Sequence, residues 1–374
     1  MNERKTESFN AVPPVSVFYL ARKAEGSEAL RVFADSYRRH PAGAPHDLVV
    51  IYKGFTGQED FESAQKVFAD IPHTILMLDD VAYDLGSYAM AACQITSPFV
   101  FCLNTFSEIL SPNWLSKILP HIQKPDVGVV GASCSYESTS SSLTLLNKAL
   151  FFQHLYPENN NRAVQEYLGF LWNFSPGKTR WQNRIKGLLN KLKNAVLSPK
   201  ALTYLDKINW EEWLTSWHET DKGPLDYLLT FPCFPNPHVR SNGFMIRKER
   251  LLKWLDPLPV TKFDCAGLEC GPDGLTRQLH RQGLKALAVG ADGRAYTMEE
   301  WPLTGIFRSG EQHNNLVGDN RTREYLAMPP KEKILYQRMS WGDYLLAEPE
   351  DFPRFDAYFL KDPSLGGFII APKA

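Results

Sequence analysis

Apolar and polar positions alternate in blocks along the first 135 residues, and these blocks predict strands and helices in turn. Runs of consecutive apolar residues, such as VSVFYLA at 15–21, are typical of strands that are buried on both faces. Segments with apolar residues three or four positions apart, such as SEALRVFADSYRRH at 27–40, predict amphipathic helices. The expected strands are 15–21, 47–55, 73–80, 99–104 and 127–133, and the expected helices are 27–40, 59–71, 86–95 and 112–123.

Continuous apolar strands separated by helices predict an α/β fold, with a mostly parallel, Rossmann-like central sheet and helices on both of its faces. In sheets of this kind, ligands bind outside the carboxyl ends of the strands. The candidate ligand contacts at these ends are Ala21, Arg22, Lys53, Asp79, Asp80, Asn104 and Ser107.

A different pattern between residues 140 and 230 predicts a helical insertion. Three stretches with helical spacing follow one another there, joined by turns that contain Pro and Gly. After the insertion, alternation returns, so the sheet is expected to resume. The expected elements are a strand and a helix within 239–255, a helix at 273–284 and a strand at 285–290. Residues 331–374 are rich in aromatics and Pro and are expected to pack over the domain as a tail.

Charge and composition narrow the class of protein. The 374 residues carry a formal net charge of -1, and proteins that mainly bind nucleic acid need a basic surplus, so no nucleic-acid partner is expected. The N-terminal residues are polar and no run of about 18 apolar residues occurs, so neither a signal peptide nor a membrane span is expected. Six cysteines without a CxxC pair predict buried thiols and a cytoplasmic location.

Four stretches occur in an order that is more specific than any one of them alone. They are VSVFYLAR, DLGSYAMAACQI, FVFCLNTFSEILSPNWLSKI and LECGPDGLTRQLHRQGLKALAVG. Their order and spacing resemble those of the GT-A-fold glycosyltransferases, in particular the family-2-like inverting enzymes that build bacterial polysaccharides. The resemblance implies a nucleotide-sugar-binding half at residues 12–135 and an acceptor-side half at residues 231–330.

The resemblance also implies an activity: transfer of a sugar from a nucleotide-diphosphate donor to a glycan or lipid-linked glycan, with inversion, in cell-surface polysaccharide synthesis. Asp84, in place of the family's Asn, and the retained Gly86 would contact the donor. The alternative is a non-catalytic protein of the same GT-A-like fold that binds glycans or takes part in an assembly, since a fold does not fix a function. Dinucleotide binding at VGVVGAS is disfavoured, because the stretch lacks the second close Gly of GxGxxG and follows the fifth strand.

The DxD motif that holds the metal in this family is degenerate in this sequence. Its first aspartate falls on Asn104 and its second on Phe106 or Ser107. Divalent cations prefer charged oxygen ligands, which an amide or a hydroxyl does not supply. The resemblance therefore implies at most a weakly held Mg or Mn ion, with Asn104, Glu108 and His313 as candidate ligands.

Two chemical tasks remain for a transferase of this kind. Without a tightly held metal, cationic side chains must meet the charge of the departing diphosphate, and Lys53 and Arg240 are the candidates. Inversion also needs a carboxylate to take the proton from the acceptor hydroxyl. The resemblance places this base near GLECGPDG, with Glu269 as the first choice and Asp273 as the second, because Asp273 is also typical of a helix N-terminus.

A basic stretch inside the expected insertion suggests a membrane contact. Residues 178–197 contain Lys and Arg together with a Trp and aliphatic residues at helical spacing, and residues 167–205 contain no acidic residue. A basic amphipathic helix of this composition can lie on an anionic membrane surface, here the inner face of the cell membrane. The alternative is a solvated basic face over an ordinary apolar stripe.

Overall fold

The computed structural model describes residues 14–142, 227–228 and 230–342. The chain divides into two compact units, residues 1–137 with 235–365 and residues 138–234 with 366–374. The helices expected within 140–230, the basic stretch 178–197 and the tail beyond residue 342 lie outside the described residues. In the described part of the second unit, the hydroxyl of Ser138 donates to the Pro232 carbonyl at 2.6 Å.

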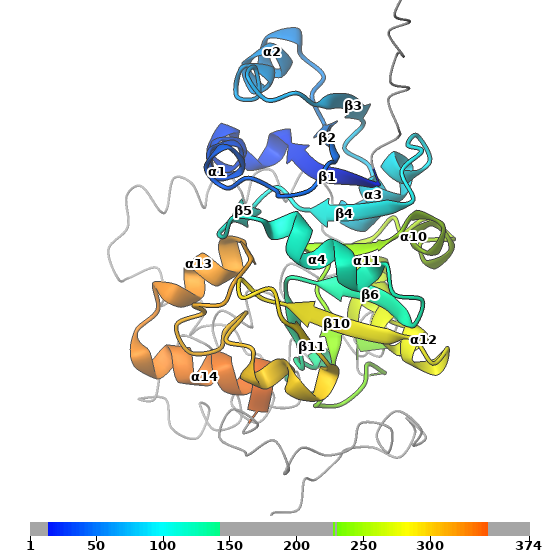
Figure 1. The fold of residues 1–374 in the computed structure, drawn as a ribbon, viewed down its shortest axis with the longest axis vertical. Coiled ribbons are helices and arrows are strands. Elements are labelled where there is room, and N and C mark those ends of the chain that lie inside the picture. Colours follow the sequence, from blue (N-terminus) through cyan, green and yellow to red (C-terminus); the bar gives the residue numbers. More distant parts are fainter. Residues whose placement is uncertain (1–13, 143–226, 229, 343–374) are drawn as a thin grey trace, which may run out of the picture. The chain divides into compact units, whose positions relative to one another are not determined.

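The first unit is built on an eight-stranded sheet with the order β11-β10-β6-β9-β4-β1-β2-β3 (Figure 1). Strand β1 is parallel to β2 and β4, β2 is parallel to β3, and β6 is parallel to β10. Strand β9 enters antiparallel between β4 and β6, and β11 is antiparallel to β10. The strands are β1 Val15–Arg22, β2 Asp47–Lys53, β3 Thr74–Leu78, β4 Phe99–Leu103, β6 Val127–Gly131, β9 Phe244–Arg247, β10 Lys285–Val289 and β11 Ala295–Tyr296.

Helices connect these strands, and short strand pairs lie beside them. The α-helices are α1 Ser27–Arg39, α2 Gln58–Lys66, α3 Asp84–Ala92, α4 Trp114–Ile122, α10 Lys248–Trp254, α11 Lys262–Cys270, α12 Leu275–Arg281, α13 Asn320–Leu326 and α14 Pro330–Trp341. The 3-10 helices are η1 Lys23–Glu25 and η3 Met298–Leu303. Strand β5 Glu108–Ile109 pairs with β12 Val317–Gly318, and β7 Cys134–Ser135 pairs with β8 His238–Val239.

Helices α1, α2 and α4 cover one face of the sheet. Tyr19 of β1 stacks on Phe33 of α1 with ring centroids 3.7 Å apart, and Phe101 of β4 stacks on Trp114 of α4 at 5.5 Å. Phe68, directly after α2, lies 5.8 Å from Tyr19 in the same apolar cluster. All five rings are fully buried, and each contributes about 1.5–3 kcal/mol through its removal from water.

Helices α3, α10 and α12 cover the opposite face. Tyr88 of α3 lies 6.2 Å from Phe244 of β9, and Phe244 lies 6.2 Å from Trp254 of α10. Leu279 of α12 packs directly on Gly128 of β6, where an added Cβ would come within 2.7 Å of it. The expected α/β class, with a mostly parallel sheet and helices on both faces, is therefore confirmed.

The chain reverses its direction of travel across the sheet at β1. Strands β2 and β3 follow on one side of β1, and α3 then carries the chain along the other face of the sheet to β4 on the opposite side. At such a switch point, the connections at the carboxyl ends of the two central strands diverge and leave a crevice. The fold therefore places its best ligand position where β1 and β4 end.

The expected order of elements is found, with two differences near the candidate site, and helices α13 and α14 were also not predicted. The predicted strand within 239–255 is divided into β8 and β9, because the chain turns at 240–243 and Gly243 adopts a φ of +70°. Helix α11 was not predicted, although Thr261 and Asp264 form a capping box at its start, and this Thr-x-x-Asp pattern is readable from sequence. Both differences bear on the candidate site.

The end of the described chain packs on the sheet unit. The indole N–H of Trp341, at the end of α14, donates to the Phe307 carbonyl at 2.8 Å, and its ring lies 5.3 Å from Tyr136. Trp341 is fully buried. The described part of the expected C-terminal tail thus belongs to this unit.

Gly86 provides a test of packing at the start of α3. An added Cβ would lie 2.6 Å from Ala82 Cβ and 2.8 Å from the Pro259 carbonyl oxygen. Helix propensity alone predicts that Gly86→Ala stabilises the protein by about 1 kcal/mol. We expect instead a decrease of about 1–3 kcal/mol in the free energy of unfolding, measured by urea denaturation, because backbone atoms cannot move aside cheaply. Unchanged or higher stability would contradict this packing.

Candidate functional site

The candidate site lies at the carboxyl ends of β1 and β4, where the turn before β9 also arrives. Strand β9 runs opposite to β4, and Phe244 at its start pairs with Cys102 near the end of β4. Residues 240–242 therefore meet the carboxyl edge of the sheet, together with the start of α3 and the end of α11.

Two carboxylates share one hydrogen-bonding residue at this edge. Asp84 lies in the first turn of α3 and Glu269 in the last turn of α11. The backbone N–H of Ser241 donates to Glu269 Oε1 at 2.7 Å, and the Ser241 hydroxyl donates to Asp84 Oδ2 at 3.4 Å. We call Asp84 and Glu269 the acid pair. Both residues are half-buried.

The surroundings of the acid pair raise the pKa of both carboxyl groups. Burial raises the pKa of Asp84 to about 6, and the nearby Glu269 carboxylate adds to the shift. Burial also raises the pKa of Glu269, against the opposing effects of the Ser241 N–H and the Arg240 charge. A carboxylate whose pKa approaches neutrality suits proton transfer, because it can both accept and release a proton at physiological pH.

Lys262, a residue that the sequence did not single out, lies within electrostatic range of this acid pair. It occupies the first position of α11. Partial burial lowers the pKa of Lys262 and the charge of Arg321 lowers it further, whereas Asp84 and Glu269 raise it. Two cations from α11 and α13 are thus close enough to affect each other beside two carboxylates. Such a position favours an anionic ligand that can separate the two like charges.

Arg240 is anchored within the protein. Its Nη2 donates to Asp319 at 2.9 Å, its Nη1 donates to the Ser133 hydroxyl at 3.0 Å, and its guanidinium lies 3.9 Å from the Phe307 ring centroid. Burial alone would raise the pKa of Asp319, but Arg240 and the Thr322 N–H hold it below its usual range. The positive charge of Arg240 is therefore balanced by a buried carboxylate.

Lys53 does not offer its charge to an open site, contrary to the sequence-based hypothesis. The residue is 1% exposed, and its ammonium donates to the Ala82 carbonyl, the Tyr83 carbonyl at 3.4 Å and the Ser87 hydroxyl at 3.1 Å. These contacts use all three N–H bonds of the ammonium. Lys53 fixes the linker between β3 and α3, where Ala82 has a φ of +59°.

Asn104 forms a hydrogen-bonded turn at the position of the first family aspartate. Its Oδ1 accepts the Phe106 N–H at 3.0 Å, and its own N–H donates to Asn242 Oδ1 at 2.9 Å. The buried Ser107 donates to the same Asn242 oxygen at 2.7 Å. Asn242, another residue missed from sequence, therefore holds the turn after β4 against the turn before β9.

The candidate metal ligands do not fit a metal site in the described part of the chain. Asn104 Oδ1 is committed to its turn, and Glu108 pairs with Arg323 at 3.0 Å. His313 packs against Gly305, where an added Cβ would lie 3.0 Å from the imidazole Cε1. Among the described residues, no group of three or more His, Cys, Asp and Glu side chains could hold a metal ion.

The remaining candidate donor contacts differ in exposure. Ala21 is fully buried in the core and Gly86 is buried against Pro259, so both position backbone and neither faces open space. Arg22 binds Asp80 through two hydrogen bonds of 2.9 and 3.0 Å and is half-exposed beside the crevice. Asp79 is exposed.

The second candidate base lies apart from the acid pair. Asp273 precedes α12, is 78% exposed at its side chain and pairs with Arg281 at 2.8 Å. Among the described residues, no hydrogen bond joins its carboxylate to Ser241 or Asp84. Glu269 is therefore the better-placed base.

Comparisons with known proteins give little further information. No protein-family model and no curated protein matches the chain. Among solved structures, the chain is similar to the mannosyltransferase PcManGT from Pyrobaculum calidifontis in complex with GDP-Man and Mn2+, at 12% identity and a TM-score of 0.27, over 37% of this chain and 39% of that one. It is also similar to GalNAc-T7 with UDP, GalNAc and Mn2+, at 14% identity and a TM-score of 0.27, over 33% of this chain and 23% of that one. The matches span well under half of either structure, and similarity this small carries no argument about activity.

The acid pair predicts a pH dependence of stability. Asp84 binds its proton more tightly in the folded state, where its pKa is about 6, than in the unfolded chain, where the usual value is 3.8. The contribution of Asp84 to stability is therefore present below the unfolded value and is lost as the pH rises through about 6. We expect urea denaturation to show that Asp84→Asn stabilises the protein more at pH 7, about one unit above the folded pKa, than at pH 4.5, where the folded carboxyl is mostly protonated.

The control for this experiment is Asp126→Asn. Hydrogen bonding to Lys285 lowers the pKa of the exposed Asp126, so its substitution should change the pH dependence in the opposite direction. Equal pH dependence in the parent and in Asp84→Asn would show that the Asp84 carboxyl is not perturbed.

Proposed function

We propose that this chain is a glycosyltransferase of GT-A-like fold that moves a sugar from a nucleotide-diphosphate donor to a hydroxyl group of a glycan or lipid-linked glycan. The observation that supports this most directly is the acid pair, joined through Ser241 beside the switch point of the sheet. Proton-accepting carboxylates at a ligand-binding crevice are what hydroxyl activation requires. The order of motifs along the sequence adds the sugar-nucleotide donor to this inference.

Glu269 takes the part of general base in this proposal. It removes the proton from the acceptor hydroxyl as that oxygen bonds to the anomeric carbon, and the bond from this carbon to the diphosphate breaks. The diphosphate leaves with the electron pair, and a single displacement inverts the configuration. Ser241 fixes the Glu269 carboxylate through its N–H, while burial raises the pKa of that carboxylate.

Lys262 and Arg321, in place of Lys53 and Arg240, face the departing diphosphate. Lys262 lies within electrostatic range of the acid pair, and its repulsion from Arg321, which pairs with Glu324 at 3.1 Å, is relieved when an anion binds between the two cations. The half-exposed Arg22, held by Asp80, is a further polar contact for the donor. The proposed setting is cell-surface polysaccharide synthesis, with residues 178–197 as a peripheral contact with the inner face of the membrane.

Among the described residues, no helix has the length and apolar character needed to cross a membrane.

A non-catalytic glycan-binding or assembly protein is the second candidate. It is favoured by the turn at Asn104, which replaces the metal-binding aspartates, and by the internal use of the Lys53 and Arg240 charges. Turnover of a panel of nucleotide-diphosphate sugars, with and without a chelator, separates the two candidates. Binding of a glycan without hydrolysis or transfer of any donor would favour the non-catalytic protein.

Glu269→Gln tests the base. The amide keeps the size of the side chain and its ability to accept the Ser241 N–H, but it cannot take a proton. We expect turnover to fall by about a hundredfold or more while donor affinity, measured by calorimetry, changes little. Asp273→Asn serves as the matched control and should leave turnover near the parent level. Undiminished turnover in Glu269→Gln would dispose of the base assignment.

Lys262→Met tests the diphosphate contact. The substitution removes the charge and keeps the length of the side chain, so we expect nucleoside diphosphate binding to weaken by about tenfold, and more at low salt than at high salt. Lys285→Met is the control, because Lys285 pairs with Asp126 at the amino end of β10, on the opposite edge of the sheet. Equal effects of the two substitutions would exclude a direct role for Lys262.

A further inference from the structure

Strand β3 forms an edge of the sheet that presents apolar side chains to solvent. It is the last strand in the sheet order, and β2 is its pairing partner among the described residues. Ile75 and Met77 are each 45% exposed, and the strand sequence TILML contains no charge and no Pro. Natural edge strands usually carry charged residues or Pro, which prevent pairing with another chain. Strand β3 lacks this protection.

The backbone of Ile75 and Met77 also points outward. The Leu78 carbonyl accepts the Gly54 N–H at 2.9 Å, so the backbone groups of Leu78 face β2. Because these groups alternate along a strand, those of Ile75 and Met77 face away from β2. The same two residues therefore offer exposed apolar side chains and backbone groups that have no hydrogen-bond partner among the described residues.

We propose that β3 pairs antiparallel with β3 of a second copy of this chain, about a two-fold axis at Leu76. This register sets Ile75 of each copy opposite Met77 of the other, and these two pairs exchange N–H···O bonds. It makes Leu76 face Leu76 as a pair without hydrogen bonds, which agrees with the inward direction of its backbone groups. The surface is self-complementary, as an interface between identical chains must be.

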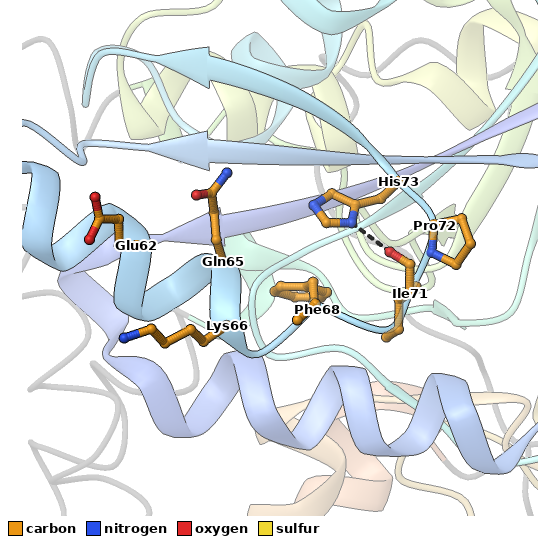
Figure 2. Close-up of a pocket in the computed structure, with 8 residues that line it drawn as sticks. Glu62, Gln65, Lys66, Phe68, Ile71, Pro72 and His73 are labelled. Atoms are coloured by element: carbon orange, nitrogen blue, oxygen red, sulfur yellow. Dashed lines mark hydrogen bonds between the residues drawn. The ribbon is translucent and has the colours of Figure 1, made fainter.

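Charge favours a second copy as the occupant of this edge. In this register the exposed Asp79 of one copy lies opposite His73 of the other, so no like charges meet along the paired strands. A hollow of about 630 Å³ adjoins His73. Figure 2 shows Gln65 and Lys66 of α2 and Pro72 and His73 before β3 around this hollow. Gln65 and Lys66 can donate hydrogen bonds to the incoming Asp79 carboxylate.

The pairing has a consequence for the candidate sites. Antiparallel strands within one continuous sheet point their carboxyl ends in opposite directions. The sites of the two copies, at the carboxyl edges of their own sheets, therefore open toward opposite sides of the dimer. A flat surface, such as a membrane, can therefore contact only one of the two sites of a dimer at a time.

Sedimentation velocity measures the association directly. Five paired residues form an interface below the standard size, so we expect a reversible dimer with a dissociation constant on the order of 10 micromolar, visible between about 1 and 200 micromolar protein. The double variant Ile75→Lys with Met77→Lys should weaken association by about tenfold or more. Met77→Pro should do the same, because it removes an outward N–H and leaves the bonds to β2 intact. Ile334→Lys, which changes an aliphatic residue 51% exposed on α14, is the control and should dimerise like the parent.

Disulfide trapping tests the register. In a Cys93→Ser background, which removes an exposed native thiol, Leu76→Cys should cross-link when diamide is added as the oxidant. Thr74→Cys should not, because the two copies of residue 74 lie about four residues apart along the paired strands, beyond disulfide reach.

Three results of sedimentation and cross-linking would overturn the proposal. They are a monomer at every concentration, a dimer that survives both the double lysine variant and Met77→Pro, and equal cross-linking at positions 74 and 76. Amide hydrogen exchange distinguishes pairing of β3 with a second copy from pairing of β3 with another segment of the same chain. Protection of the Ile75 and Met77 amides that persists in dilute monomer would show that another segment of this chain occupies the edge, and would also overturn it.

Discussion

The antiparallel entry of β9 between β4 and β6 is the constraint on which the site depends. It brings three consecutive residues of the preceding turn to the carboxyl edge of an otherwise parallel region. Arg240 binds Asp319 before α13, Ser241 joins the acid pair, and Asn242 holds the turn after β4. Gly243, with a φ of +70°, permits the bend that separates this turn from β9. One short turn thus fixes segments that are far apart in the sequence.

Sequence periodicity predicted the sheet unit well because each strand of the parallel region is buried on both faces. Strands such as β1 and β4 are continuous apolar runs, and the amphipathic helices between them have a single buried side. The helix α11 was missed because its nine residues include Cys, Gly and Ala and show no strong apolar stripe, although its capping box was readable. The break between β8 and β9 was missed because Ser-Asn-Gly was read as part of a strand.

The contacts of each polar side chain were less predictable from sequence than the fold. A lysine at the end of a strand can face a ligand or a backbone carbonyl, and sequence spacing does not distinguish these. Lys53 turned out to hold the Ala82 and Tyr83 carbonyls, which lie 29 and 30 residues further along the chain. Likewise, the pairing of Asp84 with Glu269 depends on the approach of α3 to α11, which only the three-dimensional structure reveals. Both residues had been candidates, but in different roles.

Packing does not explain why the acid pair is present in this fold. Two half-buried carboxylates that repel each other oppose folding when both are ionised, and a neutral polar residue at either position would remove this cost. By contrast, the buried Asp319 is matched by Arg240, and Lys53 by three oxygen acceptors, so those charges stabilise the surrounding chain. Perturbed groups that are structurally compensated and perturbed groups that are not can thus be told apart within one crevice. The acid pair, whose hydrogen bonds and charged neighbours do not fully offset its burial, marks the position at which a ligand, through its own hydrogen bonds and charge, would complete the structure.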